Sequence, residues 1–149
     1  MLQKIKYLLP YKAPFLLVDE ITEVNDDAIS GYYRLKRDEY FYAGHFPGNP
    51  VTPGVILTEI AAQIGLVSFG IYLILRGKKD ETESFVPMFS SSNVDFLKPV
   101  YPGEKVVVSA KKEYFRFNKL KCQVEMQNEK GEVILKGSLS GIIAPANKI

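Results

Sequence analysis

The spacing of apolar residues changes twice along the chain and predicts strands, then one long helix, then strands again. Residues 29–36 alternate between apolar and polar side chains, the period of two expected of a strand with one buried face. The short apolar run at residues 15–18 is a candidate for an earlier strand. Residues 60–75 carry no charge, and the length of this stretch favours a helix. Further strand segments are expected at residues 94–97, 105–109, 120–126 and 133–143, with a hairpin turn at 128–131.

The start of the long helix carries signals of its own. Thr52 can cap the helix and Pro53 can occupy its first turn, where a backbone N–H would lack a partner in any case. A single buried helix needs a sheet curled around it to cover its apolar surface. The pattern therefore predicts an α+β architecture, an antiparallel sheet wrapped around one long central helix. Residues 1–149 show no repeat and no clear linker, so we expect a single domain, with a solvated loop at residues 77–84.

Composition removes several classes of protein. The chain has 149 residues, of which 46% are hydrophobic, and a net charge of +2, which excludes intrinsic disorder. Cys122 is the only cysteine and His45 the only histidine, so neither a disulfide scaffold nor a cysteine-rich zinc site is expected. A pI near 8.5 is too mild for a nucleic-acid binder. The basic residues between 111 and 121 are typical of a solvated strand face, or of a surface that steers an acidic protein partner.

The uncharged stretch also requires a test for a membrane span. It is bounded by Glu59 and by Arg76, which leaves fewer than the ~20 apolar residues that a spanning helix needs. A buried helix of a globular domain fits better, so no membrane span is expected. The first residues lack the long apolar core of a signal peptide, and a cytoplasmic location is expected.

The loop before the helix contains the first candidate for chemistry. Residues 44–54 hold three prolines and three glycines, which make a tightly bent and stiff loop. His45 lies near its start and could act as a base near neutral pH. Where the loop enters the helix, the backbone N–H groups of Gly54 and Val55 have no intrahelical partner and can bind a developing oxyanion.

The helix itself supplies a candidate acid. Glu59 and Gln63 lie four residues apart, hence on one helix face, in otherwise apolar surroundings. Burial would raise the pKa of the Glu59 carboxyl toward the range of a general acid. A base, a carboxylic acid and an oxyanion-binding amide are the groups needed to remove a proton beside a carbonyl and eliminate a β-hydroxyl.

Residues 44–63, GHFPGNPVTPGVILTEIAAQ, closely resemble the signature of the β-hydroxyacyl-acyl carrier protein dehydratases, which have the hot-dog fold. Residues 9–19 resemble the N-terminal motif of this family, and residues 95–104 resemble its later motif of phenylalanine, proline, glycine and an acidic residue. The resemblance implies loss of water from a (3R)-3-hydroxyacyl thioester, carried by acyl carrier protein, to give the trans-2-enoyl thioester. No metal or organic cofactor is implied.

The resemblance also implies a role for each site residue. His45 would remove the C2 proton and Glu59 would protonate the leaving 3-hydroxyl, while the Gly54 amide binds the thioester oxygen. Gln63 would orient Glu59, and the carbonyl of Val51 would hold the His45 ring. In this family the base and the acid usually come from two subunits, so a homodimer with active sites at its interface is implied, and a hexamer of three dimers is compatible.

Some residues depart from the family pattern. Residues 11–12 are Tyr-Lys where the family commonly has His-Arg, Thr52 replaces a common methionine, and Asp95 stands where a basic residue is usual. Glu59, rather than aspartate, resembles the branch that dehydrates without isomerising. Fatty-acid, lipid A and polyene chains are all compatible substrates. Two alternatives stay open: a thioesterase of the same fold, or a non-catalytic acyl-binding subunit of a dehydratase hetero-oligomer.

Overall fold

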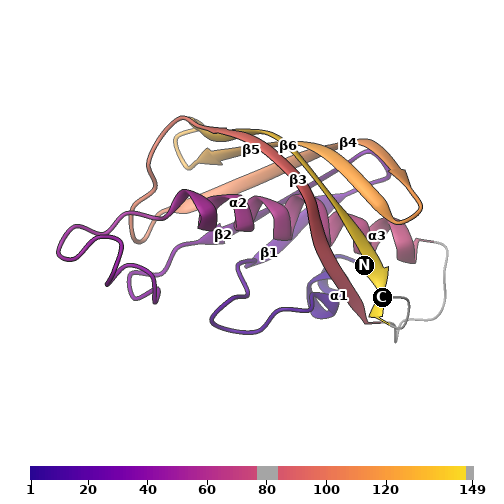
Figure 1. Cartoon of the computed structure of the whole chain (residues 1–149), viewed down its shortest axis with the longest axis horizontal. Coiled ribbons are helices and arrows are strands. Elements are labelled where there is room, and N and C mark those ends of the chain that lie inside the picture. Colours follow the sequence, from indigo (N-terminus) through magenta and orange to yellow (C-terminus); the bar gives the residue numbers. More distant parts are fainter. Residues whose placement is uncertain (77–83, 147–149) are drawn as a thin grey trace.

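The computed structural model describes residues 1–76 and 84–146, and shows a curved antiparallel sheet wrapped around one long helix (Figure 1). The six strands follow the order β1-β2-β4-β5-β6-β3. A short helix, α1, precedes them. The elements are α1 (Leu2–Leu8), β1 (Glu20–Val24), β2 (Ala28–Arg34), α2 (Gly54–Ala62), η1 (Gln63–Ser68), α3 (Phe69–Leu75), β3 (Phe85–Phe96), β4 (Lys105–Arg116), β5 (Lys119–Asn128) and β6 (Val133–Pro145).

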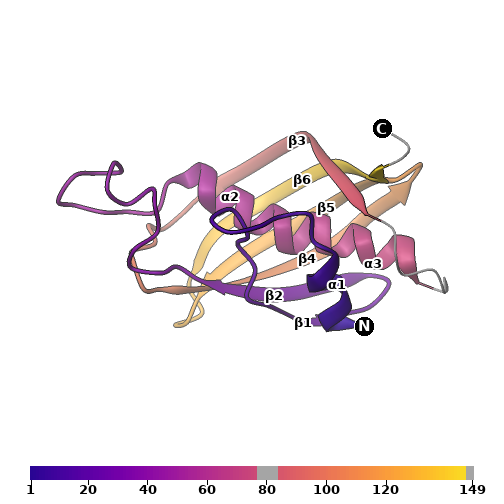
Figure 2. The same ribbon diagram turned by 90° about the horizontal axis from the view of Figure 1, so that it is seen from below.

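Strands β2, β4 and β5 follow the predicted alternation, whereas β3 is much longer than the predicted segment 94–97 and shows no alternation of burial. In β2, Ile29, Gly31 and Tyr33 are buried while their neighbours are more exposed, as the period of two requires. Residues 15–18 are not a strand, and the first strand instead covers Glu20–Val24. That apolar run is explained by packing on the helix, where the buried Leu17 and Val18 form part of the core. Figure 2 shows the N-terminal segment crossing the side of the helix that faces away from the sheet.

The central helix runs from Gly54 to Leu75, close to the predicted limits, but it is not uniform. Its middle six residues, η1, have π-helical geometry between the α-helical segments α2 and α3. The predicted cap was wrong. Pro53 is the N-cap residue and supplies no side-chain hydrogen bond, while the hydroxyl of Thr52 bonds elsewhere.

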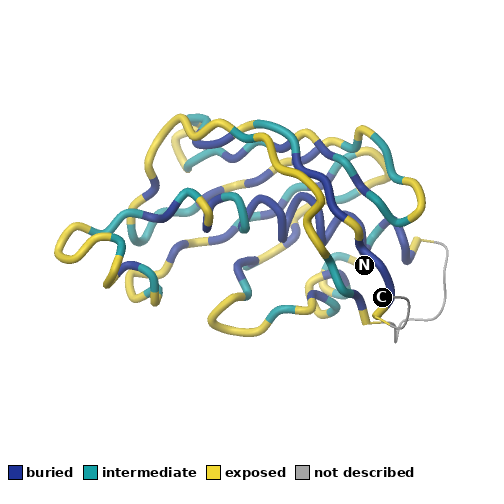
Figure 3. The backbone as a smooth tube through the Cα atoms, in the orientation of Figure 1, coloured by how far each residue is buried: buried dark blue, intermediate teal, exposed yellow. Residues whose placement is uncertain are grey.

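The helix is the core of the molecule, as Figure 3 shows by its buried colouring. By length and composition it could cross a membrane, with a mean hydropathy of 1.7, but 78% of that window is buried inside the fold. It therefore serves as a core helix, as predicted. The loop predicted at residues 77–84 lies outside the described residues, apart from Ser84.

Two glycines allow the sheet to approach this helix closely. A Cβ atom at Gly65 would lie 3.1 Å from Ala110 and 3.2 Å from Val124, and one at Gly70 would lie 2.9 Å from Ile143. Each distance is short for two carbon atoms. The helix and the inner faces of β4, β5 and β6 thus pack at a distance that a side chain would not permit.

Candidate active site

The first part of the candidate site is the His45 loop, which we define as residues 41–53. It projects from the molecule at the N-terminal end of the helix (Figure 1). Nδ1 of His45 lies 2.8 Å from the carbonyl oxygen of Val51, the contact that the family resemblance implies. Because a carbonyl only accepts, Nδ1 must carry the proton and Nε2 of the neutral ring presents a lone pair. The ring stacks on Phe46, with centroids 4.2 Å apart.

A pair of buried hydroxyl groups ties the two limbs of the His45 loop together. Oη of Tyr42 and Oγ1 of Thr52 are 2.7 Å apart. The backbone N–H of Thr52 also donates to the carbonyl of Val100, over 2.8 Å. Sequence reasoning did not single out Tyr42, because nothing local distinguishes its hydroxyl from those of neighbouring tyrosines.

The helix N-terminus follows directly. The helix begins at Gly54, whose amide makes no hydrogen bond with any of the described residues. The phenyl ring of Phe96 covers this glycine, since a Cβ added there would lie 3.2 Å from the ring. Phe96 itself is 51% exposed. The Gly54 amide is therefore free to bind an oxyanion beside a partly solvated aromatic ring.

The candidate acid bonds Gln63, whose side chain is in turn held by the N-terminal segment. Nε2 of Gln63 donates to Oε2 of Glu59 over 2.9 Å, and also to the carbonyl of Phe15 over 2.9 Å. Oε1 of Gln63 accepts from the backbone N–H of Leu17 over 2.8 Å. The Gln63 side chain therefore contacts both the candidate acid and the backbone, the two kinds of partner expected for it. Burial raises the pKa of the Glu59 carboxyl above its ordinary value, and the bond from Gln63 opposes part of that rise.

Glu59 faces an apolar cavity of about 410 Å³, the Glu59 cavity. Tyr11 also borders it, and burial, followed by the charge of Glu59, raises the pKa of the Tyr11 phenol. His45 is not among the residues that line this cavity. The cavity is lined by Pro10, Tyr11, Phe15, Glu59, Ala62, Leu66, Val67, Phe85, Val86, Pro87, Met88, Phe89 and Ile143.

The π-helical segment begins at Gln63, a feature that the sequence did not predict. Oγ of Ser68 donates to the carbonyl oxygen of Gln63 over 2.7 Å. The Ser68 hydroxyl thus provides a hydrogen-bond donor for the backbone carbonyl of Gln63. The side-chain amide of Gln63 is already bonded to Glu59 and to the N-terminal segment. Short π-helical segments frequently occur at functional sites.

Two further kinds of chemistry to consider are metal binding and a reactive cysteine. Within residues 1–76 and 84–146, no three His, Cys, Asp or Glu side chains lie close enough to hold a metal ion. Cys122 is fully buried, its thiol contacts the carbonyl of Gly65 over 3.3 Å, and burial raises its pKa to about 12. It is a core residue, as its alternation with Leu120 and Val124 predicted.

A profile of the FabA-like domain family matches residues 9–139, which is most of the chain. The chain belongs to the FabA-like domain family. Its relatives include the 3-hydroxyacyl-[acyl-carrier-protein] dehydratase FabZ of Nitratidesulfovibrio vulgaris (strain DP4), which is 36% identical over 141 residues. That match covers 93% of this chain and 84% of the relative. The predicted family membership is confirmed.

Two other relatives are longer than the matched region. The bifunctional enzyme LpxC/FabZ of Chlorobaculum tepidum is 36% identical over 141 residues, which are 93% of this chain but 29% of that protein. FabZ of N. vulgaris (strain Miyazaki F) is 43% identical over 107 residues, 70% of this chain and 66% of the relative. The chain thus spans less than two thirds of the length of these two relatives.

Solved structures agree on the architecture. The dehydratase heterocomplex ApeI:P of Xenorhabdus doucetiae aligns with a TM-score of 0.77 at 17% identity, covering 96% of this chain and 92% of that one. A mutant thioesterase of Pseudomonas aeruginosa aligns with a TM-score of 0.68 at 13% identity, covering 97% and 94%. At these identities the likeness concerns the fold alone, and it confirms the predicted hot-dog fold.

Proposed function

We propose that this protein is a 3-hydroxyacyl-acyl carrier protein dehydratase, which converts a (3R)-3-hydroxyacyl thioester into the trans-2-enoyl thioester and water. The observation that carries the proposal is the half-buried carboxyl of Glu59, which bonds Gln63 and faces an apolar cavity. Family membership and the dehydratase relatives support the same reaction.

The proposed reaction uses one base, one acid and one amide. Nε2 of His45 takes the C2 proton, and the electrons of that C–H bond form the new double bond as the C3–O bond breaks. The protonated carboxyl of Glu59 gives its proton to the leaving hydroxyl, which departs as water. The Gly54 N–H stabilises negative charge on the thioester oxygen. Proton exchange with solvent then restores a neutral imidazole and a protonated carboxyl.

A homodimer would bring the base of one subunit to the acid of the other. His45 does not line the Glu59 cavity of its own chain, which supports a shared site. The long strand β3, twelve residues, ends the sheet, and among the described strands it pairs with β6 alone. Its free edge can extend the sheet into a second copy. We therefore propose a dimer formed across β3.

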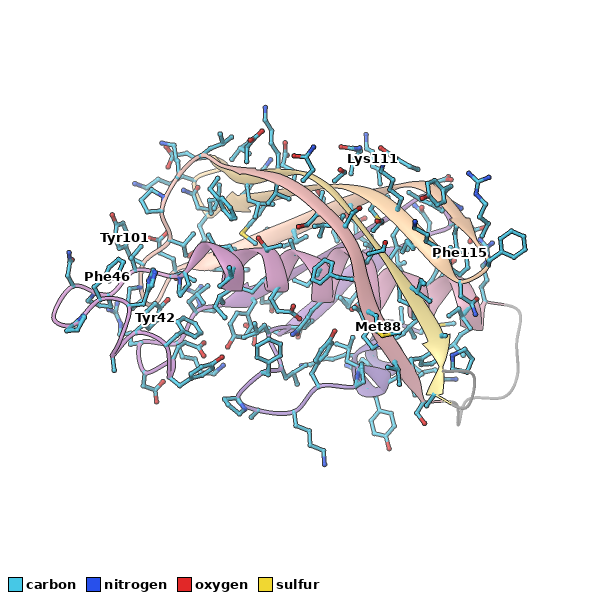
Figure 4. All side chains as sticks on the ribbon, viewed as in Figure 1. Tyr42, Phe46, Met88, Tyr101, Lys111 and Phe115 are labelled. Carbon is cyan, nitrogen blue, oxygen red and sulfur yellow. The ribbon has the colours of Figure 1, made fainter. Side chains whose placement is uncertain are left out.

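The basic hairpin, residues 111–121 of β4 and β5, is the surface that we assign to the carrier protein. It contains five basic side chains and one acidic one, in a chain whose total charge is +2. Figure 4 shows Lys111 and Phe115 along this hairpin, toward the opposite end of the molecule from Phe46. In a dimer with antiparallel β3 strands, each basic hairpin would lie toward the His45 loop of the other subunit. An acidic carrier would then be steered to that site.

The test is mass spectrometry of a (3R)-3-hydroxyacyl carrier protein incubated with the purified protein and an enoyl reductase to draw the equilibrium forward. We expect the reduced acyl product with the wild type and its loss in both His45→Ala and Glu59→Gln. A free carrier thiol would instead identify a thioesterase. An intact substrate across several chain lengths, with a correctly folded dimer, would overturn the proposal in favour of a non-catalytic subunit.

A further inference from the structure

We propose that the hydroxyl pair of Tyr42 and Thr52 is a positioning device that fixes the ring of His45 for proton abstraction. The inference rests on the proposed function, because it concerns the base of that reaction. Neither hydroxyl touches the reacting atoms. Tyr42 and Thr52 act through the loop that carries the imidazole and are positioning residues, not catalytic ones.

The pair closes the His45 loop at its base. Oη of Tyr42 and Oγ1 of Thr52 lie 2.7 Å apart, and both side chains are at least 95% buried. Tyr42 comes three residues before His45, and Thr52 directly follows Val51, whose carbonyl holds the ring. Figure 4 places Tyr42 at the same end of the molecule as Phe46, the neighbour of His45. Each hydroxyl would lack a partner if the limbs separated, and an unpaired buried hydroxyl is unfavourable.

The connection from the pair to the ring is a single peptide group. The carbonyl of Val51 and the N–H of Thr52 belong to one planar peptide unit. On one side this unit accepts the bond from Nδ1 of His45 at 2.8 Å, and on the other it donates to the carbonyl of Val100 at 2.8 Å. Any tilt of Thr52 therefore redirects the oxygen that holds the imidazole.

The other bonds of the loop cannot replace this connection. The N–H of His45 donates to the carbonyl of Phe41, and the N–H of Val51 donates to the carbonyl of His45. Both are local and preserve the internal shape of the loop, so they would move together with it. The Tyr42–Thr52 bond joins the limbs to each other, and the Thr52–Val100 bond joins them to the segment after β3, at its buried residue Val100. They set where the ring lies relative to the substrate.

Steady-state kinetics with the full-length protein and a (3R)-3-hydroxyacyl carrier protein test this role. Thr52→Val and Tyr42→Phe each remove one hydroxyl with little change in shape. We expect kcat to fall about tenfold in each, with KM within about twofold, as for a misplaced catalytic group. Thr52→Ser should retain most of the wild-type kcat. The double variant should be no slower than either single variant, because the two hydroxyls act as one unit.

Tyr72→Phe is the matched control. It removes a tyrosine hydroxyl that donates one hydrogen bond, to Asp26 over 3.1 Å, at the other end of the central helix. We expect its kcat to equal that of the wild type. An equal loss in Tyr72→Phe would overturn the positioning role, since any lost hydroxyl would then have the same effect.

A spectroscopic measurement separates positioning from a general loss of structure. His45 is the only histidine, so the imidazole ¹⁵N resonances report this ring alone. We expect the neutral wild-type ring to carry its proton on Nδ1, and a mixture of tautomers in Thr52→Val and Tyr42→Phe. A lower kcat with an unchanged tautomer, or an unchanged kcat in both variants, would overturn the inference. If the wild type leaves the substrate intact, the proposed function fails, while the tautomer measurement still decides whether the pair holds the ring.

Discussion

The side-chain amide of Gln63 donates to Oε2 of the Glu59 carboxyl from one turn further along the same helix, over 2.9 Å. The same side chain bonds the backbone of Phe15 and Leu17, which cross the helix from the N-terminal segment. The orientation of the candidate acid therefore depends on a segment more than forty residues away in the sequence. The Gln63 side chain therefore contributes both to the stability of the fold and to the position of the proposed acid.

Replacing Gln63 by leucine should lower both the free energy of unfolding and kcat. The substitution leaves the buried N–H of Leu17 without its acceptor, which costs about 1–3 kcal/mol of unfolding free energy. It also frees the carboxyl of Glu59, so we expect kcat to fall with stability. Urea unfolding and steady-state kinetics measure the two effects. Gln127→Leu is the control, since among the described residues its side-chain amide bonds the nearby Glu125 side chain alone, and the substitution should change the unfolding free energy by less than about 0.5 kcal/mol. Equal losses in the two variants would contradict the assignment.

Glu59 should make the protein less stable as the pH rises. Burial raises its pKa in the folded state, so its contribution to stability is present at low pH and is lost as the pH rises through the folded pKa. Glu59→Gln should therefore unfold at higher urea concentration than the wild type at pH 8, and the difference should shrink toward pH 4. A difference that does not vary with pH would exclude a raised pKa.

Glu132 should show the opposite dependence of stability on pH and serves as a comparison. Hydrogen bonds from Lys98 and Asn128, and the nearby positive charge, lower its pKa, so its contribution is present above the unfolded pKa and is lost on acidification. Glu132→Gln should be less stable than the wild type at pH 8 and should match it in acid. Urea titrations across the same pH range, at low salt, measure this. If both glutamine variants moved in the same direction, side-chain charge would not be the cause.

Gly54→Ala should impair turnover by displacing Phe96. The new Cβ would lie 3.2 Å from the Phe96 phenyl ring, which packs against Gly54 beside its amide-bearing helix start. We expect kcat/KM to fall about 10- to 100-fold, somewhat less than for complete removal of an oxyanion donor. Adding Phe96→Leu to Gly54→Ala should recover most of that loss, whereas Phe96→Leu alone serves as the control. No recovery in the double variant would show that the methyl group itself obstructs the substrate.

Cys122 should be inert while the protein is folded. Its side chain is fully buried and burial raises the pKa of its thiol to about 12, so the reactive thiolate is scarce at neutral pH. We expect no reaction with a thiol reagent at pH 8 in native buffer and one equivalent in denaturant. Rapid modification of native protein would place Cys122 at an accessible surface instead.

Local signals were sufficient for part of the site. The prolines and glycines around His45 predicted a stiff loop, and the uncharged stretch predicted the helix that ends at Leu75. Both depend on neighbours in the sequence. The strand predicted at residues 15–18 was wrong for a tertiary reason. In a short apolar run, side chains that pack on a helix cannot be distinguished by sequence from those of a buried strand. The first strand began instead at Glu20.

The connections among site residues were less accessible to sequence reasoning. Oγ1 of Thr52 could bond a helix amide or another side chain, and its choice of Tyr42 depends on how the loop closes. Most of the length of β3 was also missed. Its polar residues 90–93 obscure the alternation of a strand because they lie at the edge of the sheet, where both faces are less buried.

The π-helical segment has a consequence for how the central helix tolerates changes in length. A residue added to or removed from an α-helix rotates everything beyond it by about 100°. A π-helical turn, however, holds more residues than an α-helical turn, so deleting one residue within Gln63–Ser68 would convert η1 into continuous α-helix and leave α3 close to its present phase against α2. The same deletion within α2 has no wide turn to absorb it, and Ile143 would then face a bulky side chain where it now meets Gly70. The extra residue therefore makes η1 the part of the central helix that can lose a residue with least damage to the core.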